Sequence, residues 1–341
     1  MMRRLLHWIG LAALGLLLLA TAAWGSAALW FDGPSSRPLA GVIAAGFILV
    51  ALILLGSLRL LWRGLVGYGV LFAIVLVWWL SLDPSNDRNW QRDVEYPPTA
   101  SIDGDRLTIH NLRNFDYRSV DDYTPHWERR NYDLSRLVGV DLYFFYWGSP
   151  WIAHTIVSWE FEDAPPLAIS IETRKEIGEE YSAVRGFFRQ FELYYVVADE
   201  RDVIRLRTNL RGDEGYLYQV NWSPSDARDL LLAYLKEVNR IASAPRWYNA
   251  FNHNCTTTIR FHVQQIGMAR ALNWRVLVNG KGPELLYMRR VVNTTMPFRE
   301  LRSQSYINER GRAAGRTADF SKRIREGLPS RPPPDEDRRH R

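Results

Sequence analysis

The stretch 151–173, WIAHTIVSWEFEDAPPLAISIET, is the part of the chain that best predicts the fold. Trp151–Phe161 and Leu167–Thr173 are rich in β-branched and aromatic residues, and two prolines lie between them. This pattern is typical of two strands joined by a tight turn. We therefore expect an antiparallel hairpin in which the numbers of paired residues sum to about 326.

A histidine, His154, interrupts the otherwise apolar first strand of this hairpin. The expected register places Glu172 opposite His154, on the same face of the sheet. Ser170 takes that place if the register slips by two residues. A carboxylate beside an imidazole can orient a catalytic base, and it can equally form an ion pair exposed to solvent.

The flanking sequence predicts more strands and then helices. Further strands are expected at Arg106–His110, Val138–Trp147, Phe191–Ala198, Val203–Thr208 and Tyr216–Val220. Ser223-Pro224-Ser225-Asp226 has the composition of a helix start, and it precedes Ala227–Ile241, whose apolar residues recur at helical spacing. The fold class predicted is α+β, with an antiparallel sheet covered by helices.

Cys255 is the only cysteine, and it follows Asn254, a good N-cap, at the start of a helix expected over Thr256–Gln265 and ended by Gly267. A thiol at a helix N-terminus has a lowered pKa, because the helix dipole stabilises the thiolate. Placement alone leaves a nucleophile and a packed structural thiol equally open. A domain outside the cytoplasm cannot form a disulfide with one cysteine, which favours a functional thiol.

A thiolate nucleophile needs a base within hydrogen-bond reach. Of the seven histidines, His253 lies on the loop before Cys255, and His262 lies two helical turns after it, about 10 Å away. His154 is therefore the expected base, with Glu172 as the third member. The sequence contains no G-x-S-x-G, H-E-x-x-H, C-x-x-C or phosphate-binding loop, and we predict neither a metal nor a cofactor.

Residues 1–82 differ in composition from the rest of the chain. Three apolar runs, at about Leu5–Leu29, Leu39–Trp62 and Val66–Leu82, contain no acidic residue and predict two or three transmembrane helices. Arginines precede the first run and follow the second, which puts the N-terminus in the cytoplasm and everything after Leu82 outside. The first run also resembles a cleavable signal peptide, and its removal would leave the later topology unchanged.

The remaining chain divides by composition into a linker (83–98), a globular domain (99–298) and a tail (299–341). The tail carries 12 Lys and Arg against 7 Asp and Glu, a net charge of +5 out of the chain's +6. We expect it to be disordered, either as a solvated tail or in contact with anionic lipids or the cell wall. Nucleic acid is excluded as a partner, because the excess charge is confined to the tail of an exported domain.

Several motifs in order resemble the bacterial family called the Lnb N-terminal periplasmic domain over about residues 90–275. They are Phe115–Arg118, the strand of His154, Ile169–Glu176, Phe188–Glu192, Val197–Asp202, Arg205–Asn209 and Tyr248-Asn249 followed by Asn254–Thr257. The resemblance implies a circularly permuted papain-like, NlpC-type fold, similar to lecithin:retinol acyltransferase, in which the histidine strand precedes the cysteine helix. It also implies Cys255 as nucleophile and His154 as base, and its namesake acts in N-acylation of lipoproteins.

Together these features predict a cysteine acyltransferase anchored in the bacterial inner membrane, with its catalytic domain in the periplasm and a lipoprotein or phospholipid substrate. Backbone N–H groups at the start of the Cys255 helix, with Asn254 and Thr256 beside them, would form the oxyanion or substrate site. Two alternatives remain open, a cell-wall peptide amidase or peptidase of the same fold and a catalytically inactive envelope scaffold.

Overall fold

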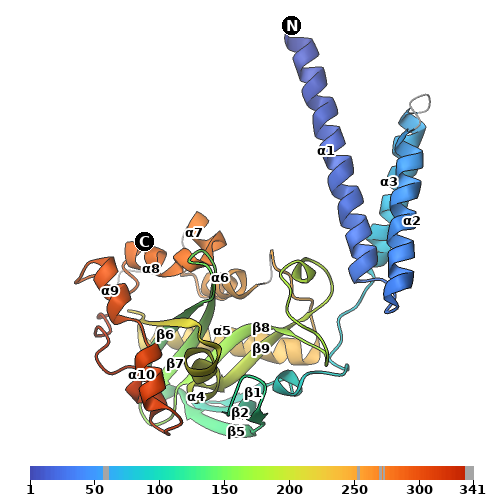
Figure 1. Ribbon diagram of the computed structural model, residues 1–341. Coiled ribbons are helices and arrows are strands. Elements are labelled where there is room, and N and C mark those ends of the chain that lie inside the picture. Colours follow the sequence, from blue (N-terminus) through green and yellow to red (C-terminus); the bar gives the residue numbers. More distant parts are fainter. Residues whose placement is uncertain (57–60, 252–253, 269–270, 272, 335–341) are drawn as a thin grey trace. The chain divides into compact units, whose positions relative to one another are not determined.

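The computed structural model describes residues 1–56, 61–251, 254–268, 271 and 273–334 (Figure 1). The chain forms two compact units. The first comprises Met1–Ser85 with Tyr181–Phe191, and the second comprises Asn86–Glu180 with Glu192–Arg341.

The first unit contains three helices, α1 (Met2–Phe31), α2 (Arg37–Gly56) and α3 (Leu61–Leu80). By length and composition all three can cross a membrane, so the third apolar run is a helix like the other two. Phe47, Ala51, Tyr68 and Val75 form the centre of their packing. A Cβ atom at Gly25 would lie 2.8 Å from the Phe47 ring, which explains how α1 and α2 approach closely at this point.

The second unit is built on a twisted, mostly antiparallel sheet in the order β1-β2-β9-β8-β7-β6-β10, with β5 paired to β2. Only the contact between β2 and β9, at Arg113 and Ala198, is parallel. The strands are β1 (Thr99–Asp103), β2 (Arg106–Arg113), β5 (Trp127–Asp133), β6 (Leu137–Tyr146), β7 (Ala153–Phe161), β8 (Leu167–Arg174), β9 (Glu192–Asp199) and β10 (Glu214–Gln219), with β3 (Asp116–Tyr117) and β4 (Tyr123–Thr124) in a small separate sheet. The α+β prediction is confirmed.

Helices cover both faces of the sheet (Figure 1). α5 and α6 pack on the face of Trp159, whose indole N–H donates to the Ala227 carbonyl. The opposite face packs on α4, α10, α11 and the residues after α11. The helices are α4 (Glu200–Arg205), the π-helix Leu206–Arg211, α5 (Pro224–Ser243), α6 (Cys255–Gln265), α7 (Trp274–Leu277), α8 (Gly282–Met288), α9 (Phe298–Gln304), α10 (Asn308–Ala314) and α11 (Phe320–Arg323), with short 3₁₀ turns at Arg92–Val94, Leu134–Arg136, Arg185–Phe187 and Asn279–Lys281.

The predicted hairpin is β7–β8, and its register is as expected. Ile156 pairs with Ser170 and Trp159 with Leu167, so the numbers of paired residues sum to 326. The same alternation puts His154, Ser170 and Glu172 on one face, together with Ile156.

The strand predicted at Val203–Thr208 is wrong, because these residues are helical in α4 and the π-helix. The Asp199 side chain caps α4 by accepting from the Arg201 N–H, and Glu200 and Asp202 in the first turn favour the helix dipole. These acidic start signals outweigh the alternating apolar pattern that follows them.

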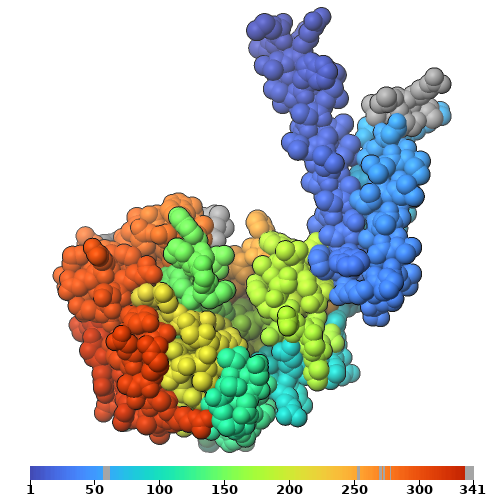
Figure 2. Space-filling model, viewed as in Figure 1, coloured from blue at the N-terminus to red at the C-terminus, as the bar shows by residue number. Residues whose placement is uncertain are grey.

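The disorder predicted from residue 299 is wrong for the described part of this stretch, up to residue 334. Ile307, Phe320 and Ile324 are fully buried in the core on the face opposite α5. In Figure 2 the orange and red C-terminal residues form a large part of one face of this unit. The predicted linker 83–98 also packs in part, since Trp90 and Val94 belong to the same core.

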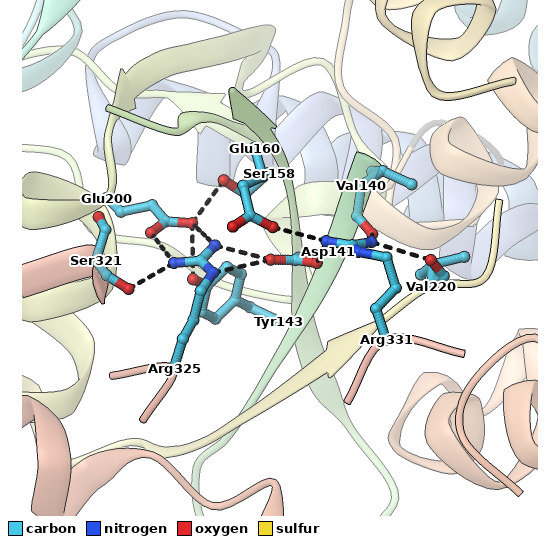
Figure 3. A network of polar contacts seen from close by, with 10 residues as sticks. All are labelled: Val140, Asp141, Tyr143, Ser158, Glu160, Glu200, Val220, Ser321, Arg325 and Arg331. Carbon is cyan, nitrogen blue, oxygen red and sulfur yellow. Dashed lines mark hydrogen bonds and ion pairs between the residues drawn. The ribbon is translucent and has the colours of Figure 1, made fainter. Parts of the chain in front are cut away.

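A buried ionic network explains why so charged a segment is ordered (Figure 3). The guanidinium of Arg325 binds both Glu200 and Asp141, whose side chains are fully buried. Arg331 binds Asp141 and Glu160 and donates to the Val140 carbonyl. Two of the arginines that made this segment look like a solvated tail, Arg325 and Arg331, are therefore partners of carboxylates in β6, β7 and α4.

Candidate functional site

His154 lies near the beginning of β7, where the sheet face carries three polar side chains among apolar ones. Its Nε2 atom lies 2.7 Å from Ser170 Oγ and 3.0 Å from Glu172 Oε1. Ser170 also donates to Glu172 Oε1 over 2.7 Å. The two acceptors that the hairpin register offered as alternatives thus both contact the same ring nitrogen.

The Glu172 carboxylate has a second cationic neighbour. Arg207, in the π-helix, donates from Nη2 to Glu172 Oε1 over 3.2 Å and from Nη1 to Asp213 Oδ2 over 3.0 Å. Gly212, at φ +75°, ends the π-helix and allows the turn that brings Asp213 back to Arg207. Arg207 is a site residue that the sequence did not reveal, because it lies in the segment misread as a strand.

Ser170 and Arg207 influence the protonation states of His154 and Glu172. Burial alone would raise the pKa of Glu172, but the charges of His154 and Arg207 and the Ser170 hydrogen bond hold it well below its ordinary value. Burial alone would lower the pKa of His154, but the Glu172 carboxylate raises it above its ordinary value, against an opposing contribution from Arg207. The pair therefore favours an ionised carboxylate and a protonated imidazole.

Cys255 is the first residue of α6, as predicted, and its side chain is half-buried. Asn254 caps the helix by accepting from the Thr256 and Thr257 N–H groups, both over 3.0 Å, while its own Nδ2 donates to the Ala250 carbonyl. The helix cap thus uses the Asn254 oxygen and the Ala250 carbonyl takes one N–H of Nδ2, and the predicted oxyanion role of Asn254 stays a prediction. Thr256 remains beside the sulfur, with 3.8 Å between Oγ1 and Sγ.

Among the described residues, the sulfur of Cys255 lies nearest to the Thr256 hydroxyl and the Asn279 amide, while the polar contacts of the His154 ring are with Ser170 and Glu172. Burial alone would raise the pKa of Cys255, but the nearby His154 ring, the Thr256 hydroxyl and the Thr155 backbone bring this pKa below its ordinary value. A lowered pKa at a helix N-terminus is what a reactive cysteine requires. Proximity to an imidazole is necessary for a cysteine nucleophile, and it is not sufficient.

Asn279 is a second neighbour of the sulfur that sequence reasoning missed. Its Oδ1 accepts from the Ala153 N–H over 2.9 Å, and its Nδ2 lies 4.0 Å from Cys255 Sγ. A Cβ at Gly280 would come within 2.5 Å of the Pro150 carbonyl oxygen, so glycine lets this turn lie against the start of β7. The Asn279-Gly280 pair reads from sequence as an ordinary turn, and only the fold brings it to Cys255.

A pocket of about 170 Å³ lies beside the thiol. Thr256 and Asn279, both neighbours of the sulfur, form part of its wall. The wall is mostly aliphatic and aromatic, with Val140, Phe144, Val157, Leu230, Val263 and Leu285, and it also contains the arginines Arg260, Arg275 and Arg289. An apolar cavity of roughly 150 Å³ is enough to hold a benzene ring, so the pocket can accept a hydrocarbon group.

The remaining predictions concern other histidines and metals. His262 is fully buried and pairs with the Tyr195 hydroxyl, at 2.9 Å, and burial lowers its pKa to about 4. His253 lies outside the described residues. Across the part of the chain that the structure describes, no group of three or more His, Cys, Asp and Glu side chains is arranged to hold a metal ion.

Comparisons with known proteins add one match. No curated protein and no solved structure matches the chain. The segment that contains β6, the β7–β8 hairpin, Cys255 and Asn279 is similar to a known family: residues 123–280 match the family model described as the Lnb N-terminal periplasmic domain.

Proposed function

We propose that the chain is a membrane-anchored cysteine acyltransferase that works through an acyl-enzyme thioester. The observation that supports the proposal is the buried His154–Glu172 pair, whose charge lowers the pKa of the Cys255 thiol, together with an apolar pocket beside the cysteine. Three helices able to cross a membrane and a match to a domain named periplasmic suggest a membrane protein with a periplasmic domain. We infer an inner-membrane location with the site in the periplasm.

The first half-reaction would form the thioester. The Cys255 thiolate attacks an ester or amide carbonyl carbon, and the carbonyl electrons move to the oxygen. When the tetrahedral intermediate collapses, the bond to the leaving group breaks and protonated His154 gives that group its proton. Glu172 orients the ring and stabilises its positive charge, as the third member of a triad does.

The second half-reaction would resolve the thioester. An amine attacks the thioester carbonyl, His154 takes the proton of that amine, and the carbon–sulfur bond breaks to restore the thiolate. Water in place of the amine gives hydrolysis. The histidine strand precedes the cysteine helix in the chain, which is the order of a permuted papain-like domain, and we infer that fold.

The character of the pocket favours an acyl chain over a cell-wall peptide. A peptide would bring several backbone amides that need hydrogen-bond partners, and apart from its three arginines the wall supplies few of them. A fatty acyl chain of a phospholipid or lipoprotein needs only apolar contact. The carbonyl at its head would then lie near Thr256 and Asn279, the wall residues next to the sulfur.

The experiment that tests this function uses the full chain in phospholipid vesicles with a peptide bearing a free N-terminal amine. Release of lysophospholipid together with an acylated peptide supports acyl transfer, and lysophospholipid alone indicates hydrolysis. Cleavage of cell-wall peptides without lipid turnover would replace the proposal by the amidase, and no turnover of either substrate would leave a scaffold.

Asn279 is expected to donate to the oxyanion. Asn279→Asp keeps the oxygen that accepts from the Ala153 N–H but removes the donor, and we expect kcat to fall by about 10²–10³-fold. Asn273→Asp is the matched control, because Asn273 caps α7 through its oxygen and aspartate caps equally well. Equal activity of the two variants would exclude an oxyanion role for Asn279.

The lowered pKa predicts a reactive thiol. Alkylation of Cys255 by iodoacetamide should rise with pH around a midpoint below that of a free cysteine, because the thiolate is the reacting form. In His154→Ala the burial that raises the pKa of Cys255 remains, but the imidazole that lowers this pKa is gone. The midpoint of alkylation should therefore move above that of a free cysteine. A wild-type midpoint at or above that of free cysteine would contradict the interaction between thiol and imidazole.

A further inference from the structure

The segment Tyr181–Phe191, which connects β8 to β9 in the chain, belongs to the unit of the membrane helices. Arg189 donates from Nη1 to the Leu80 carbonyl over 3.2 Å and also to the Leu82 carbonyl. Gln190 donates from Nε2 to the Phe31 carbonyl over 2.8 Å and to Asp32 Oδ1 over 2.7 Å. In Figure 2 the segment, yellow-green, lies against the end of α1.

The partners of this segment mark the membrane boundary. Phe31 and Leu80 are the last residues of α1 and α3, and Asp32 follows at once. The Trp79 indole N–H donates to Asp32 Oδ2 over 2.7 Å, and the Arg189 guanidinium lies 4.5 Å from a Trp79 ring centroid. A tryptophan beside charged groups at a helix end is typical of the layer between hydrocarbon and water. In a bilayer crossed by these helices, the contacts would place the segment at the level of the lipid head groups.

The segment also exposes apolar side chains. Val184 is 59% exposed, Phe187 48% and Tyr181 52%. By contrast, Phe188 and Phe191 are buried, and the Phe188 ring lies 5.0 Å from that of Phe31. The 3₁₀ turn Arg185–Phe187 separates the two sets, so the buried ring anchors the segment while Val184 and Phe187 stay uncovered.

We propose that Tyr181–Phe191 is a membrane-binding loop whose Val184 and Phe187 side chains insert into the interfacial layer of the bilayer that the three helices cross. Apolar and aromatic side chains gain free energy at that depth, whereas in water they would be exposed without a partner. The inference does not depend on the chemistry of Cys255.

Membrane binding itself is no test, because the three helices keep every variant in the membrane. The test must instead measure how deep the loop side chains lie in the bilayer. In a Cys255→Ser background, Val184→Cys and Phe187→Cys carry a nitroxide in vesicles of phosphatidylethanolamine and phosphatidylglycerol. Collision rates with oxygen and with a water-soluble nickel complex are measured by paramagnetic resonance. Val42→Cys, in α2, is the reference inside the bilayer, and Val120→Cys, between β3 and β4, is the reference in water.

The loop is expected to give an oxygen-to-nickel ratio several-fold above that of position 120 and below that of position 42. Dilution of the lipid by detergent should bring the ratio at positions 184 and 187 down towards that of position 120. A ratio at both loop positions equal to that of position 120 in vesicles would overturn the proposal. Protection from both reagents would also overturn it, because it indicates coverage by protein.

Discussion

Replacing Cys255 by alanine is expected to reduce acyl transfer by about 10⁴-fold or more, because the thioester cannot form without the sulfur. The substitution removes one atom at the first residue of α6, a position where alanine is well tolerated. The Asn254 cap bonds to Thr256 and Thr257 and stays intact. The loss should therefore appear in turnover and not in the unfolding temperature.

The assay for this variant is initial-rate release of lysophospholipid, with thermal unfolding of the same sample as the control for folding. Cys255→Ser is expected to be nearly as inactive. A serine hydroxyl is a far weaker acid than a thiol, so it would not ionise beside His154 as the thiol does. Wild-type turnover in the alanine variant would remove Cys255 from the mechanism, whatever the substrate is.

Loss of Arg325 is expected to destabilise the second unit by about 3–5 kcal/mol. Its Nη1 and Nη2 atoms donate to Glu200 over 2.7 Å each, and Nε and Nη2 donate to Asp141 over 3.1 and 2.8 Å. In Arg325→Ala the Glu200 carboxylate keeps Tyr143 and Ser158 as donors but loses its cation (Figure 3). A charge buried without a partner is costly, and the cavity left by the side chain adds to that cost.

The pH dependence separates this ionic effect from lost packing. Burial raises the pKa of Glu200, but Arg325 outweighs it and lowers the pKa below the ordinary value. The wild-type pair therefore contributes stability above the unfolded pKa of a glutamate, and this contribution is lost as the pH falls. In the variant, burial is no longer offset and Glu200 protonates more easily. The difference in the free energy of unfolding between Arg325→Ala and the wild type should be largest near neutral pH and smaller in acid.

Arg323→Ala is the matched control, because Arg323 ends α11 only two residues before Arg325 and its bond to Asp319 is exposed to solvent. We expect a change of about 1 kcal/mol or less for it. The free energy of unfolding of the wild type and both variants is measured in guanidinium chloride by near-UV circular dichroism, at several pH values between neutral and acid. Equal stability of Arg325→Ala and Arg323→Ala would show that the C-terminal segment does not hold the sheet.

The sequence predicted the β7–β8 hairpin well because its signal is local. Two apolar strands and a short turn leave one register that buries both, and that register brings Glu172 and Ser170 to His154. The helix start at Cys255 is local in the same way, since Asn254 caps the residues that follow it. The catalytic role of these residues remains a prediction.

What the sequence did not reveal depends on contacts between distant segments. Asn279 binds Ala153, which lies 126 positions earlier in the sequence, and the local sequence of a turn does not predict such a contact. The tail was misread because Arg325 looks like any solvated arginine until Asp141, 184 positions earlier, is beside it. Composition reports the charge of a segment and does not report whether that charge has a buried partner.

The proposed function requires Cys255 to carry an acyl group during turnover. Its most direct test is the intact mass of the full chain, quenched in acid after incubation with phospholipid and mapped to peptides. We expect a mass increase of one fatty-acyl group on the peptide that contains Cys255, removed by hydroxylamine and absent from Cys255→Ala and His154→Ala. Turnover of phospholipid with no adduct on that peptide, or with an equal adduct in Cys255→Ala, would contradict it.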